Sequence, residues 1–371
     1  MKICTLTTYD VYNYGASLQA YALQTYLTQQ GHDVEIIRYQ PEYLSRKYDY
    51  RWVNPESKMS RWAVTRCAYR IAKYMQRQTT LGRKRIFDDF NHQVLRETKR
   101  EYRTFEELCQ HPPQADAYIC GSDQIWNVFY EAGRDPAFYL EFAPKRTKKA
   151  SYAASFSYLD INEENRQRIA KSLKKFDAVS VREYHGLEIL KSMSIKGTWV
   201  LDPVFLLPMK QWHEFAQGSR VQTGGEPYLL VYDFEGNGLL KECAKMYARQ
   251  HGLKVYAITD TYPQWYADRN FTKAGPMEFV RLIEGCQAFM SNSFHGTAFS
   301  ILFHKPLFVF ERHRHAVNSR MESLLTLFEM KNRIVTDTGS LDAHEIDWDS
   351  VEEIRSKELA RSVEFLENID V

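Results

Sequence analysis

The segment KICTLTTYDVYNYGASLQAYALQTYLTQQGHDVEIIRY, residues 2–39, predicts a strand, a helix and a second strand in that order. Residues 2–7 and 34–39 are apolar runs of strand length. Between them, apolar side chains recur at helical spacing over residues 18–30, and Gly31 ends the pattern. A β-α-β unit with a glycine in the loop before its helix is typical of doubly wound α/β folds. The loop lacks the G-x-G-x-x-G pattern, so it supports a dinucleotide site only weakly.

Further α/β units follow along the chain. A length of 371 residues favours two domains over one. A second alternating series begins at residue 228, with strands predicted at 228–234, 254–259, 288–292 and 306–310. We therefore expect an α/β protein in which two domains, residues 1–207 and 208–349, face a cleft. A helical insertion is predicted at about residues 42–110. An acidic C-terminal helix, about residues 350–371, is expected to pack back on the first domain.

The composition is that of an ordinary soluble protein, with 44% hydrophobic and 26% charged residues. A net charge of +2 implies no general attraction to nucleic acid. The six cysteines have neither C-x-x-C nor metal-site spacing, so we expect reduced cysteines, a cytoplasmic protein and no metal. The opening MKICTLTTYD has no signal-peptide character, and no apolar run approaches the roughly 20 residues of a membrane span.

Residues 61–100 form a strongly basic segment, with eleven Lys or Arg against three Asp or Glu. Arg66, Arg70, Lys73 and Arg77 recur at helical spacing within it. This pattern is compatible with a solvated helix face. It is also compatible with a surface that meets anionic lipid or a phosphorylated acceptor, which would place the protein peripherally at the inner face of a membrane.

The sequence SNSFHG, residues 291–296, joins an apolar strand to an apolar helix. This arrangement places the backbone N–H groups of residues 294–296 at a helix N-terminus, where unpaired donors and the helix dipole attract anions. His295 adds an imidazole that can bind an anion or transfer a proton near neutral pH. The alternative is that His295 is a packed or capping residue.

Other polar motifs also follow predicted strands. They are Asn13-Tyr14-Gly15, GSDQIWN at residues 121–127, Arg182-Glu183 and Asp202-Pro203. In open α/β sheets, ligands bind beyond the carboxyl ends of the strands, so these motifs are expected to border one site.

Six short motifs in this order resemble the polysaccharide pyruvyl transferase family. They are NYGASLQAYAL (13–23), GSDQIWN (121–127), SVRE (180–183), LDPVFLL (201–207), SNSFHG (291–296) and RHRHAVNSR (312–320). Each motif alone is moderately specific, but their fixed order over nearly the whole chain is a stronger signal.

The resemblance implies two Rossmann-like domains arranged as in the GT-B glycosyltransferases. It further implies transfer of an enolpyruvyl-derived group from phosphoenolpyruvate to a sugar, which yields a pyruvate ketal during capsule or other cell-envelope polysaccharide biosynthesis. The acceptor would be a saccharide, often lipid-linked. Such a reaction requires no metal or redox cofactor.

The resemblance also suggests residues for the donor site. Arg182 matches the arginine of the family's S-x-R motif and is expected to bind an oxyanion of phosphoenolpyruvate; the alternative is a structural ion pair with Glu183 or Asp202. His295 matches the family histidine and is the candidate general acid. Ser293 stands where the family pattern has arginine, so one expected cation is missing; the serine can cap the helix and offer a hydroxyl but cannot neutralise charge. Arg312, Arg314 or Arg320 can supply that charge from the following segment. Gly296 is a further donor-site candidate.

Residues of both domains are candidates for the acceptor site. Asp123 is the candidate general base, or else a helix cap. The remaining acceptor candidates are Asn13, Tyr14, Gly15, Ser122, Gln124, Trp126, Asn318 and Arg320. Of these, Trp126 is the candidate stacking surface for a sugar ring. Two other functions remain open at this stage. One is a GT-B-like transferase that uses a nucleotide sugar, and the other is a non-catalytic saccharide- or phosphate-binding protein.

Overall fold

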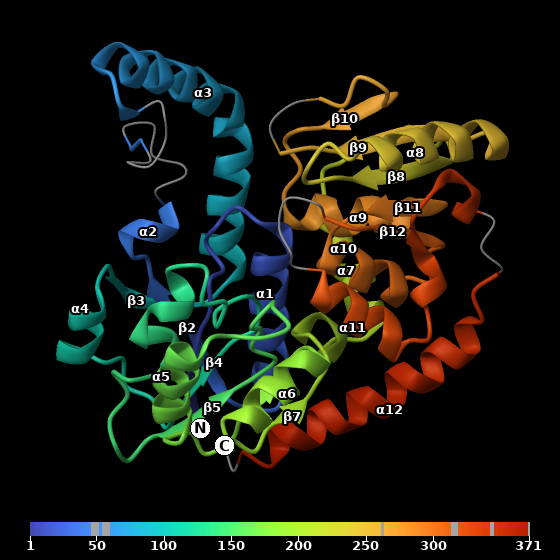
Figure 1. Ribbon diagram of the computed structural model, residues 1–371. Coiled ribbons are helices and arrows are strands. Elements are labelled where there is room, and N and C mark those ends of the chain that lie inside the picture. Colours follow the sequence, from blue (N-terminus) through green and yellow to red (C-terminus); the bar gives the residue numbers. More distant parts are fainter. Residues whose placement is uncertain (46–51, 54–59, 261–262, 313–317, 342–344, 370–371) are drawn as a thin grey trace.

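The computed structural model describes residues 1–45, 52–53, 60–260, 263–312, 318–341 and 345–369. The first lobe contains a fully parallel five-stranded sheet of order β3-β2-β1-β4-β5 (Figure 1). Its strands are β1 (Lys2–Leu6), β2 (Asp33–Tyr39), β3 (Glu97–Tyr102), β4 (Ala117–Cys120) and β5 (Lys148–Ser151). The strand order reverses between β1 and β4, which is the switch point where ligands bind in such sheets.

The second lobe contains a parallel sheet of order β10-β9-β8-β11-β12-β13. Its strands are β8 (Tyr228–Tyr232), β9 (Lys254–Ile258), β10 (Arg269–Phe271), β11 (Ala288–Ser291), β12 (Leu307–Phe310) and β13 (Ile334–Val335). This order is the one found in dinucleotide-binding folds, with its switch point between β8 and β11. The expected α/β fold with two Rossmann-like lobes is therefore confirmed.

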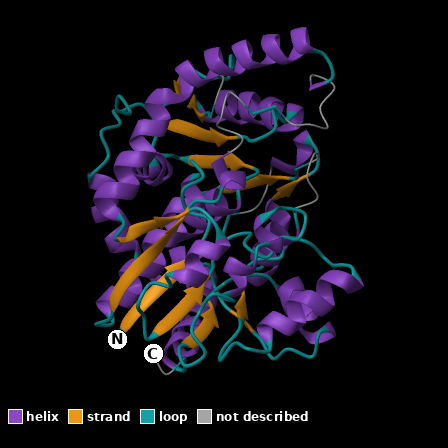
Figure 2. Ribbon diagram, turned by 90° about the vertical axis from the view of Figure 1, so that its left-hand side faces the viewer, coloured by secondary structure: helices purple, strands orange, loops and turns teal. Residues whose placement is uncertain are grey.

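Helices connect the strands and cover both faces of each sheet (Figure 2). They are α1 (Tyr14–Gln29), α2 (Glu42–Ser45), α3 (Ala63–Val94), α4 (Phe105–Gln110), α5 (Glu163–Leu173), α6 (Tyr184–Ser192), α7 (Met209–Gln217), α8 (Gly238–His251), α9 (Pro276–Gly285), α10 (Phe294–Leu302), α11 (Ser319–Leu327) and α12 (Trp348–Glu367). None of these described helices combines the length and the apolar character that a membrane span requires.

Helix α1 joins the two lobes. It is buried on nearly all sides, as expected for a helix packed between two layers. Its Tyr14 ring stacks on Phe279 of α9, with ring centroids 4.6 Å apart, and its hydroxyl donates to the Ala274 carbonyl at 3.2 Å. One hydrophobic core runs continuously from β1 and α1 into α9 and α10. The relative position of the lobes therefore rests on buried apolar contacts.

A small sheet carries Arg182. Strands β6 (Ser180–Val181) and β7 (Thr198–Trp199) pair in parallel beside β5, through bridges at Ala150–Ala178 and Ala154–Val181. Arg182 directly follows β6, so it leaves this sheet at the carboxyl end of the strand.

The segment predicted as a helical insertion, residues 42–110, contains a strand as well as helices. β3 pairs with β2 at the edge of the first sheet, and in its sequence ETKREY only Thr98 and Tyr102 are buried. Because charged residues dominate it, a strand was not expected there, although charge is common on edge strands.

Helix α12 runs from the second lobe back along the first (Figure 1). The Leu201 N–H donates to Ser362 of α12 at 2.9 Å, and Val351 and Leu366 join the main core. The domain limits at residues 207 and 208 stay a prediction.

Candidate functional site

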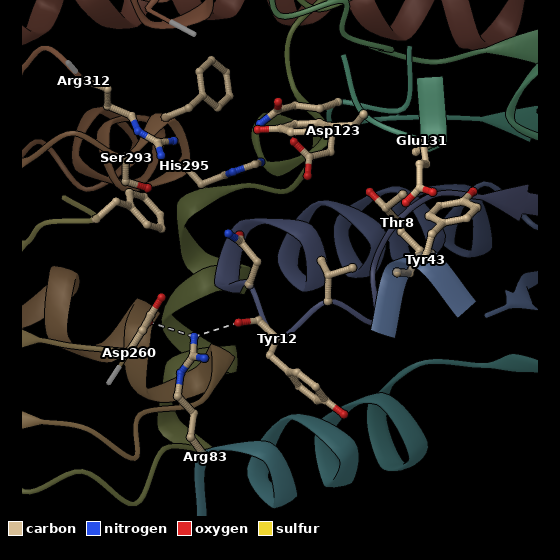
Figure 3. Close-up of a pocket in the computed structure, with 18 of the residues that line it drawn as sticks. Thr8, Tyr12, Tyr43, Arg83, Asp123, Glu131, Asp260, Ser293, His295 and Arg312 are labelled. Carbon is tan, nitrogen blue, oxygen red and sulfur yellow. Dashed lines mark hydrogen bonds and ion pairs between the residues drawn. The ribbon is translucent and has the colours of Figure 1, made fainter. Parts of the chain in front are cut away.

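A cavity of about 770 Å³ is lined by residues of both lobes. Figure 3 shows Ser293, His295 and Arg312 of the second lobe facing Asp123, Tyr43 and Glu131 of the first. The volume suits a ligand of drug or disaccharide size. Of the residues predicted as site members, the cavity is lined by Asn13, Asp123, Gln124, Ser293, His295, Arg312 and Arg320.

His295 enters the cavity from the first turn of α10. The helix begins there because the Ser293 hydroxyl caps it by accepting the Gly296 N–H at 3.2 Å. The next backbone donors, the N–H groups of Phe294 and His295, have no hydrogen-bond partner among the described residues. A helix N-terminus with unpaired donors therefore points toward the cavity, as the sequence predicted.

Gly15 lies directly against the ring of His295. A Cβ atom built at this position would come closer than 3.0 Å to the imidazole Nδ1, Cγ and Cε1 atoms. The glycine was predicted to permit close approach of an acceptor. In the structure, Gly15 instead allows the His295 side chain to come close, and Gly15 lies behind the imidazole ring.

We expect Gly15→Ala to lower turnover by about tenfold or more, because the new methyl group must displace His295 and a misplaced catalytic group reacts slowly. Steady-state kinetics compared with Gly238→Ala provide the measurement. Gly238 lies in the first turn of α8, as Gly15 does in α1, and a Cβ atom there meets nothing within 4 Å. Equal rates for the two variants would contradict the prediction.

Arg182, Asp202 and His295 form a buried charge cluster beside the cavity. An Arg182 Nη atom donates to Asp202 Oδ2 at 2.6 Å, and His295 Nε2 lies 3.4 Å from that same oxygen. Burial raises the pKa of Asp202, but the charges of His295 and Arg182 outweigh burial and hold the pKa below its usual range. Burial lowers the pKa of Arg182, yet Asp202 and Asp123 raise it overall. Arg182 and Asp202 therefore stabilise each other's charged forms.

Arg182 itself does not line the cavity. Its guanidinium is 3.4 Å from His295 Nε2 and packs 4.3 Å from the centre of the Phe294 ring. The sequence offered two roles for this residue, a donor ligand or a structural ion pair. Its terminal guanidinium nitrogens pair with the buried Asp202 and with Asp123, so Arg182 lies behind the imidazole and Asp123 as a structural ion-pair residue, while its Nε has no hydrogen-bond partner among the described residues.

Asp123 and Arg320 form the part of the cluster that faces the cavity. Asp123 Oδ1 accepts from Arg182 at 3.3 Å and lies 3.6 Å from Arg320. With its amide oxygen turned toward Arg320, Gln124 accepts from both terminal guanidinium nitrogens at 3.2 and 2.9 Å. Burial and the nearby Arg182 charge lower the pKa of Arg320 to about 10. A bound anion would relieve this unfavourable environment.

Arg312 reaches the cavity from the other side of Phe294. Its Nε donates to Glu235 at 3.1 Å, and its guanidinium lies over the Phe234 ring. Asn318 closes the loop behind it by accepting the Arg312 N–H and donating to the Arg312 carbonyl. Asn318 is therefore structural, whereas Arg320 is a cavity residue. Arg314 lies outside the described residues.

Several predicted acceptor residues are buried away from the cavity. Ser122 donates to the Ala153 carbonyl and to Asp202. The Trp126 ring is fully buried, stacks on Tyr139 and donates to the Phe138 carbonyl, so it cannot stack on a sugar. Tyr14 is buried between the lobes. Gly296, which was predicted for the donor site, packs on Phe289. Asn13 lines the cavity but also caps α1 by accepting the Ala16 N–H. These residues do follow strands or begin helices as the sequence predicted. The groups against which their side chains pack, however, come from distant segments of the chain.

Two features of the site were not predicted. Arg83 of α3 donates to the Tyr12 carbonyl at 2.8 Å and lies 3.0 Å from Asp260 of the second lobe, so it bridges the lobes across one wall of the cavity (Figure 3). Tyr130 also lines the cavity, and the preceding residue, Phe129, packs on Tyr158 with ring centroids 4.1 Å apart. Sequence alone offered only an arginine in a basic helix and the FY pair that follows GSDQIWN.

Among the described residues, no group of three or more His, Cys, Asp or Glu side chains is placed to hold a metal ion. This statement covers only metal ions bound by such a cluster.

Comparison with known proteins gives one family match. The model of the family described as polysaccharide pyruvyl transferase matches residues 13–314. No curated protein matches the sequence significantly.

Solved structures share the fold at low sequence identity. UDP-GlcNAc 2-epimerase from Methanocaldococcus jannaschii, in complex with UDP-GlcNAc and UDP, aligns with a TM-score of 0.51 and 11% identity over 99% of this chain and 100% of its own. A candidate UDP-N-acetylglucosamine 2-epimerase from Listeria monocytogenes aligns with a TM-score of 0.52 and 9% identity over 97% and 90%. The glycosyltransferase SnogD from Streptomyces nogalater aligns with a TM-score of 0.48 and 9% identity over 100% and 99%. The two epimerases therefore share the overall fold of this chain.

Proposed function

Because the chain belongs to the polysaccharide pyruvyl transferase family, we propose that it transfers an enolpyruvyl-derived group from phosphoenolpyruvate to a saccharide. The product is a pyruvate ketal on two hydroxyls of one sugar, and phosphate is released. We place this activity in capsule or other cell-envelope polysaccharide synthesis on the cytoplasmic side of the membrane, with a saccharide acceptor that is carried on a lipid.

One observation carries the proposal for the donor: cationic and N–H donors converge on one cavity from the second lobe. Arg320, Arg312, His295 and the N-terminus of α10 all line it. Phosphoenolpyruvate is a small anion with a carboxylate and a phosphate, and both need charged or N–H donors when they leave water. The Arg320 Nε atom is buried without a hydrogen-bond partner in the described part of the chain. Arg320 thereby supplies the cation that Ser293 does not.

The proposed chemistry balances with groups that line the cavity. His295 gives a proton to the methylene carbon of phosphoenolpyruvate, which becomes a methyl group, while a sugar hydroxyl bonds to the neighbouring carbon. Asp123 accepts the proton of that hydroxyl. The second hydroxyl then bonds to the same carbon as the C–O bond to phosphate breaks, and its proton leaves with the phosphate. His295 regains its proton from solvent or from Asp123.

For the acceptor we propose the first-lobe side of the cavity. Asn13 and Gln124 offer amide groups there, and Tyr130 with the adjoining Phe129 and Tyr158 offers an aromatic edge to a sugar ring. These rings replace Trp126, whose position excludes it.

Phosphoenolpyruvate binding tests the donor. Saturating ligand should raise the melting temperature, because a ligand at 100 times its Kd stabilises the folded state by about 2.7 kcal/mol. Phosphate release that requires a saccharide acceptor would exclude a purely binding role. If UDP-sugars stabilise the protein and phosphoenolpyruvate does not, the protein is instead a nucleotide-sugar transferase.

Arg320→Gln is expected to weaken phosphoenolpyruvate binding by roughly 10- to 100-fold, because it removes hydrogen bonds from a cation to the donor, each worth about 1.5–3 kcal/mol. Titration calorimetry measures the change. Arg361→Gln is the matched control, because Arg361 lies on α12 and pairs only with Glu358 among the described residues. Unchanged affinity in Arg320→Gln would remove this residue from the donor site.

A further inference from the structure

The first turns of α3 extend beyond the body of the first lobe (Figure 1). We call residues 61–75 the α3 tip. Three large apolar side chains on it are mostly exposed: Val64 at 80%, Ile71 at 60% and Met75 at 64%. Together with the small exposed residues Cys67 and Ala68, they recur every three or four positions. This spacing places them in one stripe along the helix.

The charge of this helix has a single sign over a long stretch. Residues 61–87 contain eight Lys or Arg and no Asp or Glu. On the tip, Arg66 and Arg70 are exposed and lie on a different side of the helix from the apolar stripe. Trp62, at the N-cap, is 71% exposed. An apolar stripe, a basic flank and a terminal tryptophan are the features of helices that lie in the plane of a membrane surface.

We propose that the α3 tip docks on a bilayer surface that contains anionic phospholipid. Val64, Ile71 and Met75 enter the boundary between headgroups and acyl chains, and Trp62 lies at headgroup level. The basic residues bind the lipid phosphates.

The positive charge of the α3 tip argues against a second copy of this chain as the partner that covers its apolar stripe. Pairing two α3 tips through their stripes would bring two basic helices together with no acidic partner within residues 61–87. Anionic lipid supplies both an apolar phase for the stripe and the opposite charge for its flank.

The α3 tip belongs to the same helix as residues that line the cavity. Lys73, Leu81, Arg83 and Lys84 of the same helix line the cavity wall. A docked tip therefore brings the cavity close to the bilayer, where a lipid-linked saccharide resides. This part of the inference rests on the proposed function, whereas lipid binding by the tip does not.

Vesicle co-sedimentation of the full chain tests the docking without any substrate. At low salt we expect at least about tenfold tighter binding to phosphatidylcholine vesicles containing phosphatidylglycerol than to phosphatidylcholine alone, with a loss of this preference at high salt. Ile71→Glu with Met75→Glu is expected to weaken binding by about tenfold or more. The control is Met246→Glu, which changes an exposed apolar residue on α8 of the second lobe.

Three results would overturn the proposal. The first is that the wild-type protein binds neither kind of vesicle and stays in solution. The α3 tip would then bind an acidic protein partner instead of lipid. The second is equal vesicle binding by wild type and the double variant. The third is a wild-type dimer in solution that Ile71→Glu abolishes. Because no substrate is present, the outcome is independent of whether phosphoenolpyruvate proves to be the donor.

Discussion

Replacing His295 by alanine is expected to lower turnover by about two orders of magnitude or more. Among the described second-lobe residues of the cavity wall, the imidazole is the side chain that can deliver a proton near neutral pH, and it lies in the first turn of α10. Protonation of the methylene carbon cannot be replaced by guanidinium groups, because these do not release protons in this pH range. Steady-state phosphate release with donor and acceptor measures the effect.

The affinity for phosphoenolpyruvate separates catalysis from simple damage to the site. A general acid contributes mainly in the transition state, so Kd should change much less than turnover in His295→Ala. His111→Ala is a suitable control, because that imidazole is exposed at the end of α4. A variant that keeps the wild-type rate would exclude His295 as the proton donor.

Asp202→Asn is expected to destabilise the protein by about 3–5 kcal/mol, the usual cost of removing one partner from a buried ion pair. Asp202 is fully buried, and it accepts hydrogen bonds from Arg182, at 2.6 Å, and from Ser122. Without its charge, the Arg182 guanidinium loses its nearest counter-ion, and only Asp123, which also faces Arg320, remains. Urea denaturation gives the free energy of unfolding for both proteins.

The stability difference should depend on pH in a defined direction. Nearby charges hold the pKa of Asp202 in the folded state below its usual range. A group with a depressed folded pKa stabilises the protein fully above its unfolded pKa of about 3.9 and loses this contribution as pH falls toward the folded value. The difference between wild type and Asp202→Asn should therefore be constant from about pH 7 to 5 and shrink below about pH 4.

A comparison with Asp160→Asn shows whether burial of the ion pair is the cause of the large loss of stability expected for Asp202→Asn. Asp160 pairs with Arg166 at the surface, so its loss should cost no more than about 1 kcal/mol. A similar small cost for Asp202→Asn would mean that the buried pair adds little to stability. In that case, the pair would serve mainly to orient His295 and Asp123.

Sequence periodicity was sufficient to predict the architecture. The β-α-β pattern of residues 2–39, the second series from residue 228 and the strand-to-helix junction at the start of α10 all follow from which positions along a segment are apolar. These features depend on neighbours within a few residues, so a single chain reveals them. Strand β3 was missed because its charged sequence hides an edge strand.

The sequence by itself determined the family, the two parallel α/β lobes and the strand ends where polar residues gather. Only the tertiary structure decided which of those residues reach the cavity. Trp126 turns into the core, and Arg320, 138 residues after Arg182, completes the charge cluster around Asp123. The physical reason is that periodicity reports which face of a segment is buried, whereas the partner of a buried charge or ring comes from a distant segment. That partner is known only once the lobes have packed.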